Sequence, residues 1–285
     1  MLMEFLQLKY FFNAAQTENF SKTANTFSVP ASAISQSIQR LENELGTALF
    51  ERRKNRVILN EEGKIFYQAV RQMNSILSDV NKQLADSSRN SCSEIRMQIF
   101  CNRRIISDAI QQFSRTFPEV SFVLNHGFES NKDFDLIISS DDSLKDHFTH
   151  LPLLTEQIAM IFPKDHPLAL RQSVKIADLS QERFVTMHQG SNLYLLTQQL
   201  CIKSGFAPKI SIQSDDPFYM RKYIEMGLGI GFAPMFSWKG QFSDALVRKP
   251  LEGVTRTTYV FWDPNRYLTK TVSRFLDMLI EFCKQ

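Results

Sequence analysis

Hydrophobic side chains recur at helical spacing through the first 45 residues of the chain. The first set lies three or four positions apart and consists of Phe5, Leu8, Phe12 and Ala15. This spacing predicts an amphipathic helix over residues 4–17. A short second helix follows, with Ala24 and Phe27 on its buried face. We expect Ser21 to begin it, because a serine hydroxyl can accept a free backbone N–H.

The third predicted helix separates an apolar stripe from a small, uncharged polar stripe. Its apolar positions are Ile34, Ile38, Leu41 and Leu45, and the opposite positions are Ser32, Ser35, Gln36, Gln39 and Asn43. Simple solvation is the common explanation of a polar helix face, but solvated faces usually carry Lys and Glu. Serine and glutamine can instead hydrogen-bond to base edges in the major groove of DNA. Two successive short helices, the second with this surface, are typical of a helix-turn-helix.

A basic turn follows the third helix. Gly46 is placed to end that helix, and residues 49–50 and 57–59 predict two short strands. The cations between the strands are Arg52, Arg53, Lys54 and Arg56. Basic runs are usually solvated surface, but on a hairpin beside the polar helix they are suited to binding phosphates. Residues 1–60 therefore predict a winged helix-turn-helix domain.

Residues 61–86 read as one long linker helix. Apolar side chains recur along it at alternating three- and four-residue spacing, at Phe66, Val70, Met73, Leu77, Val80 and Leu84. Such a seam is close to a heptad repeat and needs a partner, either a second copy of the helix or the chain's own C-terminal domain. The short polar segment at residues 87–92 predicts a hinge.

Strand and helix patterns alternate after the hinge, which predicts an α/β architecture. Strands are expected over residues 95–100, 120–124, 135–138, 157–162, 184–187, 210–213 and 229–233, and helices over residues 105–113, 193–203, 217–226 and 268–282. Asp215 or Asp216 is expected to cap the helix that begins at Pro217.

Composition narrows the class of protein only in part. The net charge of +3 is too small to indicate nucleic-acid binding by itself, so the local placement of charge must carry that argument. The four cysteines, Cys92, Cys101, Cys201 and Cys283, form no closely spaced pair. We therefore expect no zinc site, other metal or cofactor. With neither a signal-peptide pattern nor an apolar run near the roughly 18 residues of a membrane span, we expect a soluble cytoplasmic protein without membrane association.

The first sixty residues resemble the LysR-type transcriptional regulator signature. The matching segments are residues 20–24, 38–46, 49–52 and 59–63, together with Ser35. The resemblance implies that the third helix enters the major groove and that the basic hairpin is the wing. The expected DNA contacts are Ser21, Ser32, Ala33, Ser35, Gln36, Gln39, Arg40, Arg52, Arg53, Lys54 and Arg56. The chain departs from the family at Pro30 and Ala31, where Ser-Gln is usual, and at Gln36, where Arg is frequent, so the operator sequence is not carried over.

The resemblance also has consequences for assembly. It favours a dimer through the linker helix, and two such dimers in a tetramer. The partner would then be a double-stranded operator with two-fold symmetry. RNA polymerase is a further candidate partner.

The C-terminal half resembles the LysR effector domain. The matching segments are residue 113 with 117–120, residues 134–137, residues 151–153, residues 162–163 with 166–168, and residues 227–234. They imply a periplasmic-binding-protein-like fold over residues 93–285, with two α/β lobes joined by two crossing strands. The first lobe would take residues 93–160 and 263–285, and the second residues 161–262. Residues 128–133 are too few for the helix that the family usually has there, which would open the cleft between the lobes.

The resemblance places a small polar or anionic effector in that cleft. The expected contacts are Cys101, Asn102, Arg103, Ser139, Ser140, Met187, His188, Gln189, Gly190, Ser191 and Phe232. Arg103 could pair with a carboxylate, although any one of these positions could also be an ordinary loop residue.

The sequence therefore predicts a sequence-specific DNA-binding transcriptional regulator whose activity an effector modulates. An enzyme is not expected, because the chain has no catalytic triad pattern, phosphate-binding glycine loop or metal-ligand spacing. A redox sensor and an effector-independent regulator on the same scaffold remain alternatives. Cys201 is the only cysteine in the expected second lobe, which argues against a disulfide switch there.

Overall fold

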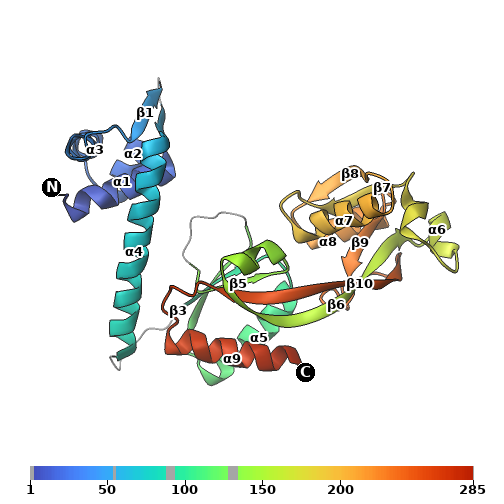
Figure 1. The fold of residues 1–285 in the computed structure, drawn as a ribbon. Coiled ribbons are helices and arrows are strands. Elements are labelled where there is room, and N and C mark those ends of the chain that lie inside the picture. The colour runs from blue at the N-terminus through green and yellow to red at the C-terminus, as the bar shows by residue number, and fades with distance from the viewer. Residues whose placement is uncertain (1–2, 54–55, 88–93, 128–133, 285) are drawn as a thin grey trace. The chain divides into compact units, whose positions relative to one another are not determined.

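The chain divides into two compact units, Met1–Asn90 and Ser91–Gln285. A computed structural model describes residues 3–53, 56–87, 94–127 and 134–284 (Figure 1). Residues 128–133, where the sequence predicts a shortened lobe, lie outside the described part. The combination of a helical N-terminal unit with a helix-and-sheet C-terminal unit confirms the predicted α/β fold.

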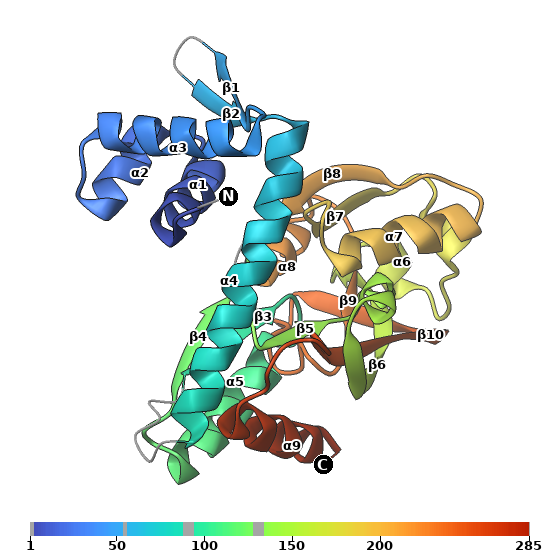
Figure 2. The ribbon, with the colours of Figure 1, turned by 60° about the vertical axis from the view of Figure 1, so that its left-hand side comes forward.

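The N-terminal unit contains three short helices, a hairpin and a long helix. They are α1 (Phe5–Thr17), α2 (Phe20–Phe27), α3 (Ala31–Leu45), β1 (Phe50–Arg53), β2 (Arg56–Leu59) and α4 (Glu61–Ser87). α3 ends at Gly46, whose φ of 70° is the left-handed conformation expected of a terminating glycine. Figure 2 shows the β1–β2 hairpin between α3 and the beginning of α4. This is the predicted winged helix-turn-helix followed by the linker helix.

The start of α2 differs from the sequence prediction. The helix begins at Phe20, and its N-cap is Asn19, whose Oδ1 accepts hydrogen bonds from the backbone N–H groups of Ser21 and Lys22 at 2.9 and 3.0 Å. Ser21 lies inside the first turn and is not the cap. Both residue types are good N-caps, and the structure uses Asn19, two positions before the predicted Ser21.

An aromatic cluster holds the N-terminal unit together. Phe11 is fully buried, and its ring centroid lies 5.6 Å from that of Phe50 and 5.0 Å from that of Phe66. The cluster therefore joins α1, the hairpin and α4. From α3 the apolar stripe enters the same core, where Ile34 and Ile38 are buried. Burial of that stripe turns the opposite, polar stripe of α3 outward.

The C-terminal unit is built on a six-stranded sheet and a smaller two-stranded sheet. The strands are β3 (Glu94–Ile99), β4 (Ser121–Asn125), β5 (Leu136–Ser139), β6 (Thr149–Pro163), β7 (Arg183–Met187), β8 (Lys209–Ser214), β9 (Gly231–Pro234) and β10 (Leu246–Trp262). The larger sheet has the order β4-β3-β5-β10-β6-β9, and β7 pairs in parallel with β8. The helices are α5 (Arg103–Thr116), α6 (Pro167–Leu170), α7 (Asn192–Lys203), α8 (Pro217–Glu225) and α9 (Lys270–Lys284), with short 3-10 turns at Asp142–Asp146 and Ile176–Leu179.

Two long antiparallel strands connect two separate hydrophobic cores in this unit. β6 and β10 pair from Thr149↔Trp262 to Pro163↔Leu246. One core gathers side chains of β3, β5, α5 and α9, and the other gathers side chains of β7, α7, α8 and β9. Figure 1 shows these groups at opposite ends of the β6–β10 ribbon. The arrangement is the predicted pair of lobes joined by two crossing strands.

Candidate functional site

The outward surface of α3 presents the side chains that the sequence predicts to contact DNA. Ser32, Gln36, Gln39 and Arg40 are exposed, Ala33 and Ser35 are half-buried, and Ser21 is exposed on α2. We call the α3 members of this set the α3 surface. These side chains are short or uncharged except for Arg40, so the helix can approach a groove closely and still offer hydrogen-bonding groups.

The hairpin is fixed to α3 by polar contacts at its base. The Glu42 carboxylate on α3 accepts hydrogen bonds from the backbone N–H groups of Leu49 (2.8 Å) and Phe50 (3.3 Å). Asn60 caps α4, because its Oδ1 accepts the N–H of Gly63 at 2.7 Å while its Nδ2 donates to the Ala48 carbonyl at 2.8 Å. These contacts hold the wing beside the α3 surface.

Gly63 explains one position of the sequence signature. A Cβ at this residue would lie 2.0 Å from the carbonyl oxygen of Leu49, so only glycine allows the first turn of α4 to pack against the hairpin. In the wing itself, Arg53 pairs with Arg56 across the two strands. The side chains of Arg52, Arg53, Lys54 and Arg56 lie outside the described part of the structure, so their predicted phosphate contacts stay predictions.

Several apolar side chains remain exposed along α4. The exposed ones are Ile65, Ile76, Leu77, Val80 and Leu84, and three of these belong to the predicted seam. Val70, nearer the hairpin, is buried in the N-terminal core. An exposed apolar row of this length on a helix is characteristic of a surface that is covered by another helix.

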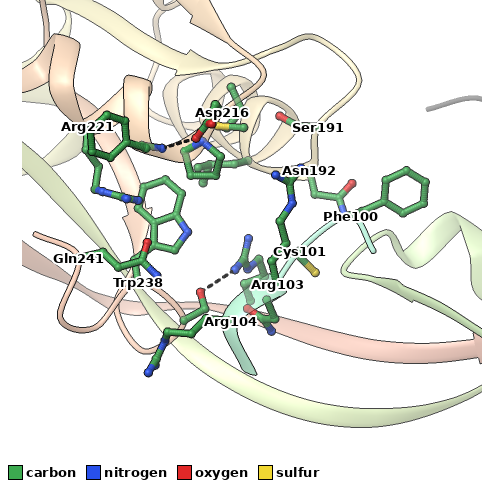
Figure 3. Close-up of a pocket in the computed structure, with 17 residues that line it drawn as sticks. Phe100, Cys101, Arg103, Arg104, Ser191, Asn192, Asp216, Arg221, Trp238 and Gln241 are labelled. Carbon is green, nitrogen blue, oxygen red and sulfur yellow. Dashed lines mark hydrogen bonds between the residues drawn. The ribbon is translucent and has the colours of Figure 1, made fainter. Parts of the chain in front are cut away.

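A pocket of about 220 Å³ lies between the two cores of the C-terminal unit (Figure 3). Its polar lining comes from the N-terminal ends of three helices, α5, α7 and α8, and from β10 and the turn that follows β9. Its charged side chains are Arg103, Arg104, Asp216, Arg221 and Arg256, and Trp238 lies among them. Helix N-termini present free backbone N–H groups and favour negatively charged ligands.

Arg221 is an unusual member of this lining. Its side chain is only 5% exposed, and its guanidinium carbon lies 4.8 Å from the ring centroid of Trp238. Nη1 is buried without a hydrogen-bond partner, and none of the described carboxylates makes an ion pair with it. Burial lowers the pKa of Arg221, an effect that nearby Asp216 and Glu225 partly offset. Both carboxylates accept hydrogen bonds from other groups. Asp216 accepts from the Phe218 N–H at 2.7 Å, and Glu225 accepts from the Lys222 ammonium and the Ser243 hydroxyl.

A buried ion pair lies where β6 and β10 cross. The Glu156 side chain is completely buried and accepts a hydrogen bond from Arg256 Nη2 at 2.6 Å. Glu156 also accepts from the backbone N–H groups of Phe236 and Ser237, at 3.1 and 2.8 Å. Arg256 Nε is buried without a partner. The pair thus ties both crossing strands to the turn after β9, which carries Trp238.

Five of the predicted effector contacts line the pocket, and the others do not. Those that line it are Cys101, Asn102, Arg103, Met187 and Ser191. Ser140 instead lines a second cavity of about 470 Å³, and its hydroxyl lies 2.9 Å from the Asn192 amide across the lobes. Ser139 is buried, while His188, Gln189 and Gly190 form the loop before α7 outside either lining. Phe232 is fully buried in the second core, 5.9 Å from the ring of Phe184, and belongs to neither lining.

Sequence reasoning missed Arg221, Trp238 and Arg256. They lie on α8, in the turn after β9 and in the middle of β10, more than 80 positions from the first cluster at residues 101–103. No local pattern distinguishes them from surface arginines and core aromatics. Only the pairing of β6 with β10 and the position of α8 bring them together.

The described cysteines ionise to thiolates less readily than a free cysteine does. Burial raises the pKa of Cys201 to about 12 and of Cys283 to about 11, and it also raises the pKa of Cys101, whose sulfur lies 3.7 Å from the Thr258 hydroxyl. Cys92 lies outside the described residues. Among the side chains that the structure describes, no group of three His, Cys, Asp or Glu residues is arranged to hold a metal ion. No helix in the same part of the chain is long and apolar enough to cross a membrane.

A helix-turn-helix unit with an exposed polar helix, joined to a two-lobed unit with a polar pocket, defines a ligand-responsive DNA-binding regulator. Residues 5–64 match the bacterial regulatory helix-turn-helix protein model of the lysR family, and residues 92–284 match the LysR substrate binding domain. The chain belongs to the LysR family of transcriptional regulators.

Individual relatives agree with this assignment along nearly the whole chain. The chain is 28% identical to the transcriptional dual regulator GltC of Bacillus subtilis (strain 168), over 98% of this chain and 97% of that protein. It is 26% identical to the uncharacterized HTH-type transcriptional regulator YybE of the same organism, over 98% of each. The fold resembles that of full-length CbnR complexed with its target DNA, with a TM-score of 0.67 at 17% identity over 98% of this chain and all of that one.

Proposed function

We propose that the α3 surface reads the operator and that the pocket of the C-terminal unit receives the effector that controls the regulator. The exposure of Gln36 and Gln39, above an α3 stripe that is fully buried in the core, carries the first part of the proposal. Side chains held outward on a rigid, well-packed helix can contact base edges without any rearrangement of the domain.

The assembly follows from the exposed row on α4. Pairing of this row with the same row of a second copy would bury it and set two α3 surfaces on a two-fold axis. The operator would then have two-fold symmetry. Two dimers would form a tetramer, as the resemblance implies. CbnR, whose fold this chain shares, has been crystallised in full length on its target DNA.

The chemistry of the C-terminal unit favours ligand binding over the two alternatives. A redox sensor needs a thiolate, whereas burial raises the pKa of each of the three described cysteines. An effector-independent regulator would not need a pocket with a buried, unpaired arginine. We infer no enzymatic activity, and the place of action is the cytoplasm, where the operator is.

The decisive test is sequence-specific binding by the purified full-length chain. Sheared DNA of its own genome is bound, recovered and sequenced, and we expect a small set of enriched sites that share a two-fold symmetric motif. Gln36→Ala should weaken binding to the best site by about 10- to 100-fold and leave binding to unrelated DNA unchanged, since a specific base contact contributes about 1–3 kcal/mol.

Glu44→Ala is the matched control, because Glu44 is exposed on the same helix but is not part of the α3 surface. Its affinity for the best site should stay within about twofold of the original protein. Absence of enriched sites, or equal losses for Gln36→Ala on every DNA, would contradict the proposal.

A further inference from the structure

The pocket of the C-terminal unit contains more positive than negative charge. Once the Arg256–Glu156 ion pair is set aside, the remaining charged groups in its lining are Arg103, Arg104, Arg221 and Asp216. Arg103 has no ion-pair or hydrogen-bond partner for its guanidinium within the described part of the chain, and Arg104 has only a 3.4 Å contact to the Phe236 carbonyl. Three guanidinium groups against one carboxylate leave the lining with an excess of two positive charges.

The burial of Arg221 makes this excess costly in the unliganded protein. An arginine that is only 5% exposed normally pairs with a carboxylate, because a buried charge without one loses its solvation and gains no ion pair in exchange. Stacking on Trp238 recovers only part of that loss, because a cation–π contact is weaker than a buried ion pair with a carboxylate. A buried Nη1 without a partner is therefore a donor held ready for a group that the chain itself does not supply.

The two lobes contribute their cations from different elements. Arg103 begins α5 in the first lobe, and Arg221 lies on α8 in the second. Figure 3 shows Arg103 on one side of the pocket and Arg221 with Trp238 on the other. A ligand with an acidic group at each end would contact both lobes at once, and its binding would favour one relative arrangement of the lobes.

The rest of the lining indicates an organic ligand of limited size. Apolar side chains, among them Met187, Leu193, Phe218 and Trp238, cover the space between the charged groups. The volume of about 220 Å³ is below the roughly 300–1,000 Å³ of pockets for drug-sized ligands. Carboxylate and phosphate both match the planar donor fork of arginine.

From these observations we propose that the pocket selects a small organic dianion, a dicarboxylate or a phosphate monoester, with one acidic group on Arg221 and the second facing Arg103. This inference rests on the proposed effector function of the pocket and specifies the class of ligand. It makes Arg221 the residue that distinguishes an anionic from a neutral metabolite.

The test is the thermal unfolding of the full-length protein with matched probes. The dianions are succinate, glutarate, phthalate and glycerol 3-phosphate, and the neutral counterparts are succinamide, glutaramide and glycerol, all at constant ionic strength. We expect at least one dianion, and none of the neutral compounds, to raise the unfolding midpoint of the C-terminal unit. Comparison of the midpoint shifts caused by the dicarboxylates with the shift caused by glycerol 3-phosphate then decides between the two anion types.

Variants of two neighbouring residues on α8 assign the effect to Arg221. Arg221→Gln should weaken binding of the responsive dianion by about 10- to 100-fold, because one partner of a buried charged contact is removed. Arg221→Lys should lie between, since lysine keeps the charge without the donor fork. Lys222→Gln removes the same single positive charge as Arg221→Gln, but from the exposed side of α8. This variant should bind the responsive dianion as tightly as the original protein does.

A stability measurement without ligand separates a binding role from a structural one. Arg221→Gln should unfold at or above the midpoint of the original protein, because it removes a buried charge without a carboxylate partner. A clearly lower midpoint would assign Arg221 to the fold and overturn the inference. No response to any of the four dianions, or a response that survives in Arg221→Gln, would overturn it as well.

Failure of the ligand class can be distinguished from failure of the proposed function. If a neutral probe alone raises the midpoint equally in the original protein and in Arg221→Gln, the pocket is an effector site but not one for dianions. The genome-wide binding experiment does not involve the pocket, so enriched operator sites would uphold the DNA-binding part of the function whatever the probes show.

Discussion

The α3 surface and the effector pocket are both polar, but they are polar in different ways. On α3 the hydrogen-bonding side chains stand in solvent above a fully buried apolar stripe. In the pocket, Arg221 Nη1 and Arg256 Nε are buried and lack partners. A surface that reads a large partner can remain hydrated until it binds, whereas a pocket for a small ligand must hold its polar groups ready at a cost in stability.

The largest expected effect is the loss of stability when one core aromatic side chain is removed from each unit. Phe11→Ala deletes a fully buried ring between those of Phe50 and Phe66 and should destabilise the N-terminal unit by about 3–5 kcal/mol. Phe275→Ala deletes the equivalent ring beside Phe113 in the C-terminal unit and should cost that unit a similar amount. Calorimetry of the full-length chain should show a lower unfolding temperature for the N-terminal unit in Phe11→Ala and for the C-terminal unit in Phe275→Ala. The same transition lowered in both would mean that the units do not unfold separately.

The two units also differ in how far their sequence predicts them. The fold of the N-terminal unit follows from local patterns: the apolar stripe of Ile34 and Ile38 fixes which side of α3 faces outward, and Gly46 marks the helix end. The error there is small: the sequence predicts Ser21 as the cap of α2, and the structure uses Asn19. A neighbouring alternative of similar propensity is the physical reason for that error.

The pocket could not be predicted in the same way. Five of its lining residues lie at or after the ends of β3 and β7, and the family resemblance predicts them. Arg221, Trp238 and Arg256 reach the pocket only through tertiary contacts. β10 is an example of the difficulty. The sequence analysis predicts no strand over its residues, yet β10 passes through Pro250 and Gly253 with a register shift against β6 between Pro250 and Thr255.

The next largest effect concerns the ion pair at the strand crossing. Glu156→Gln keeps the shape of the side chain but leaves Arg256 buried without a counter-charge, and we expect a loss of about 2–3 kcal/mol. Urea unfolding of the C-terminal unit measures it. Combining Glu156→Gln with Arg256→Gln should cost less than the sum of the two single losses. Strict additivity would show that the pair contributes no coupling between the strands.

Helix caps offer a smaller, matched comparison between the two units. Asn19→Ala removes the cap of α2, and Ser191→Ala removes the cap of α7, where the hydroxyl accepts the Tyr194 N–H at 3.1 Å. Each should cost about 1 kcal/mol. Ser191 also lines the pocket, so only its variant should weaken binding of the responsive dianion.

Ser21→Ala is the control for the cap of α2. Because Ser21 lies inside the helix, its replacement by the better helix former alanine should not destabilise the N-terminal unit. The unfolding midpoints of Asn19→Ala, Ser191→Ala and Ser21→Ala measure these effects. A loss in Ser21→Ala equal to that in Asn19→Ala would return the cap to the position that the sequence suggested.

The smallest expected effect is a pH dependence confined to the C-terminal unit. Burial lowers the pKa of His126, and Arg103 lowers it further, although the ring Nδ1 contacts the Ile99 carbonyl at 3.3 Å. The unfolded chain therefore takes up a proton before the folded chain does as the pH falls below about 6.5. The stability that neutral His126 contributes is present above that pH and is lost below it. His126→Asn should reduce the fall in the urea midpoint between about pH 7.5 and pH 5.5. A steeper fall in His126→Asn would show that the ring is stabilised in its charged form instead.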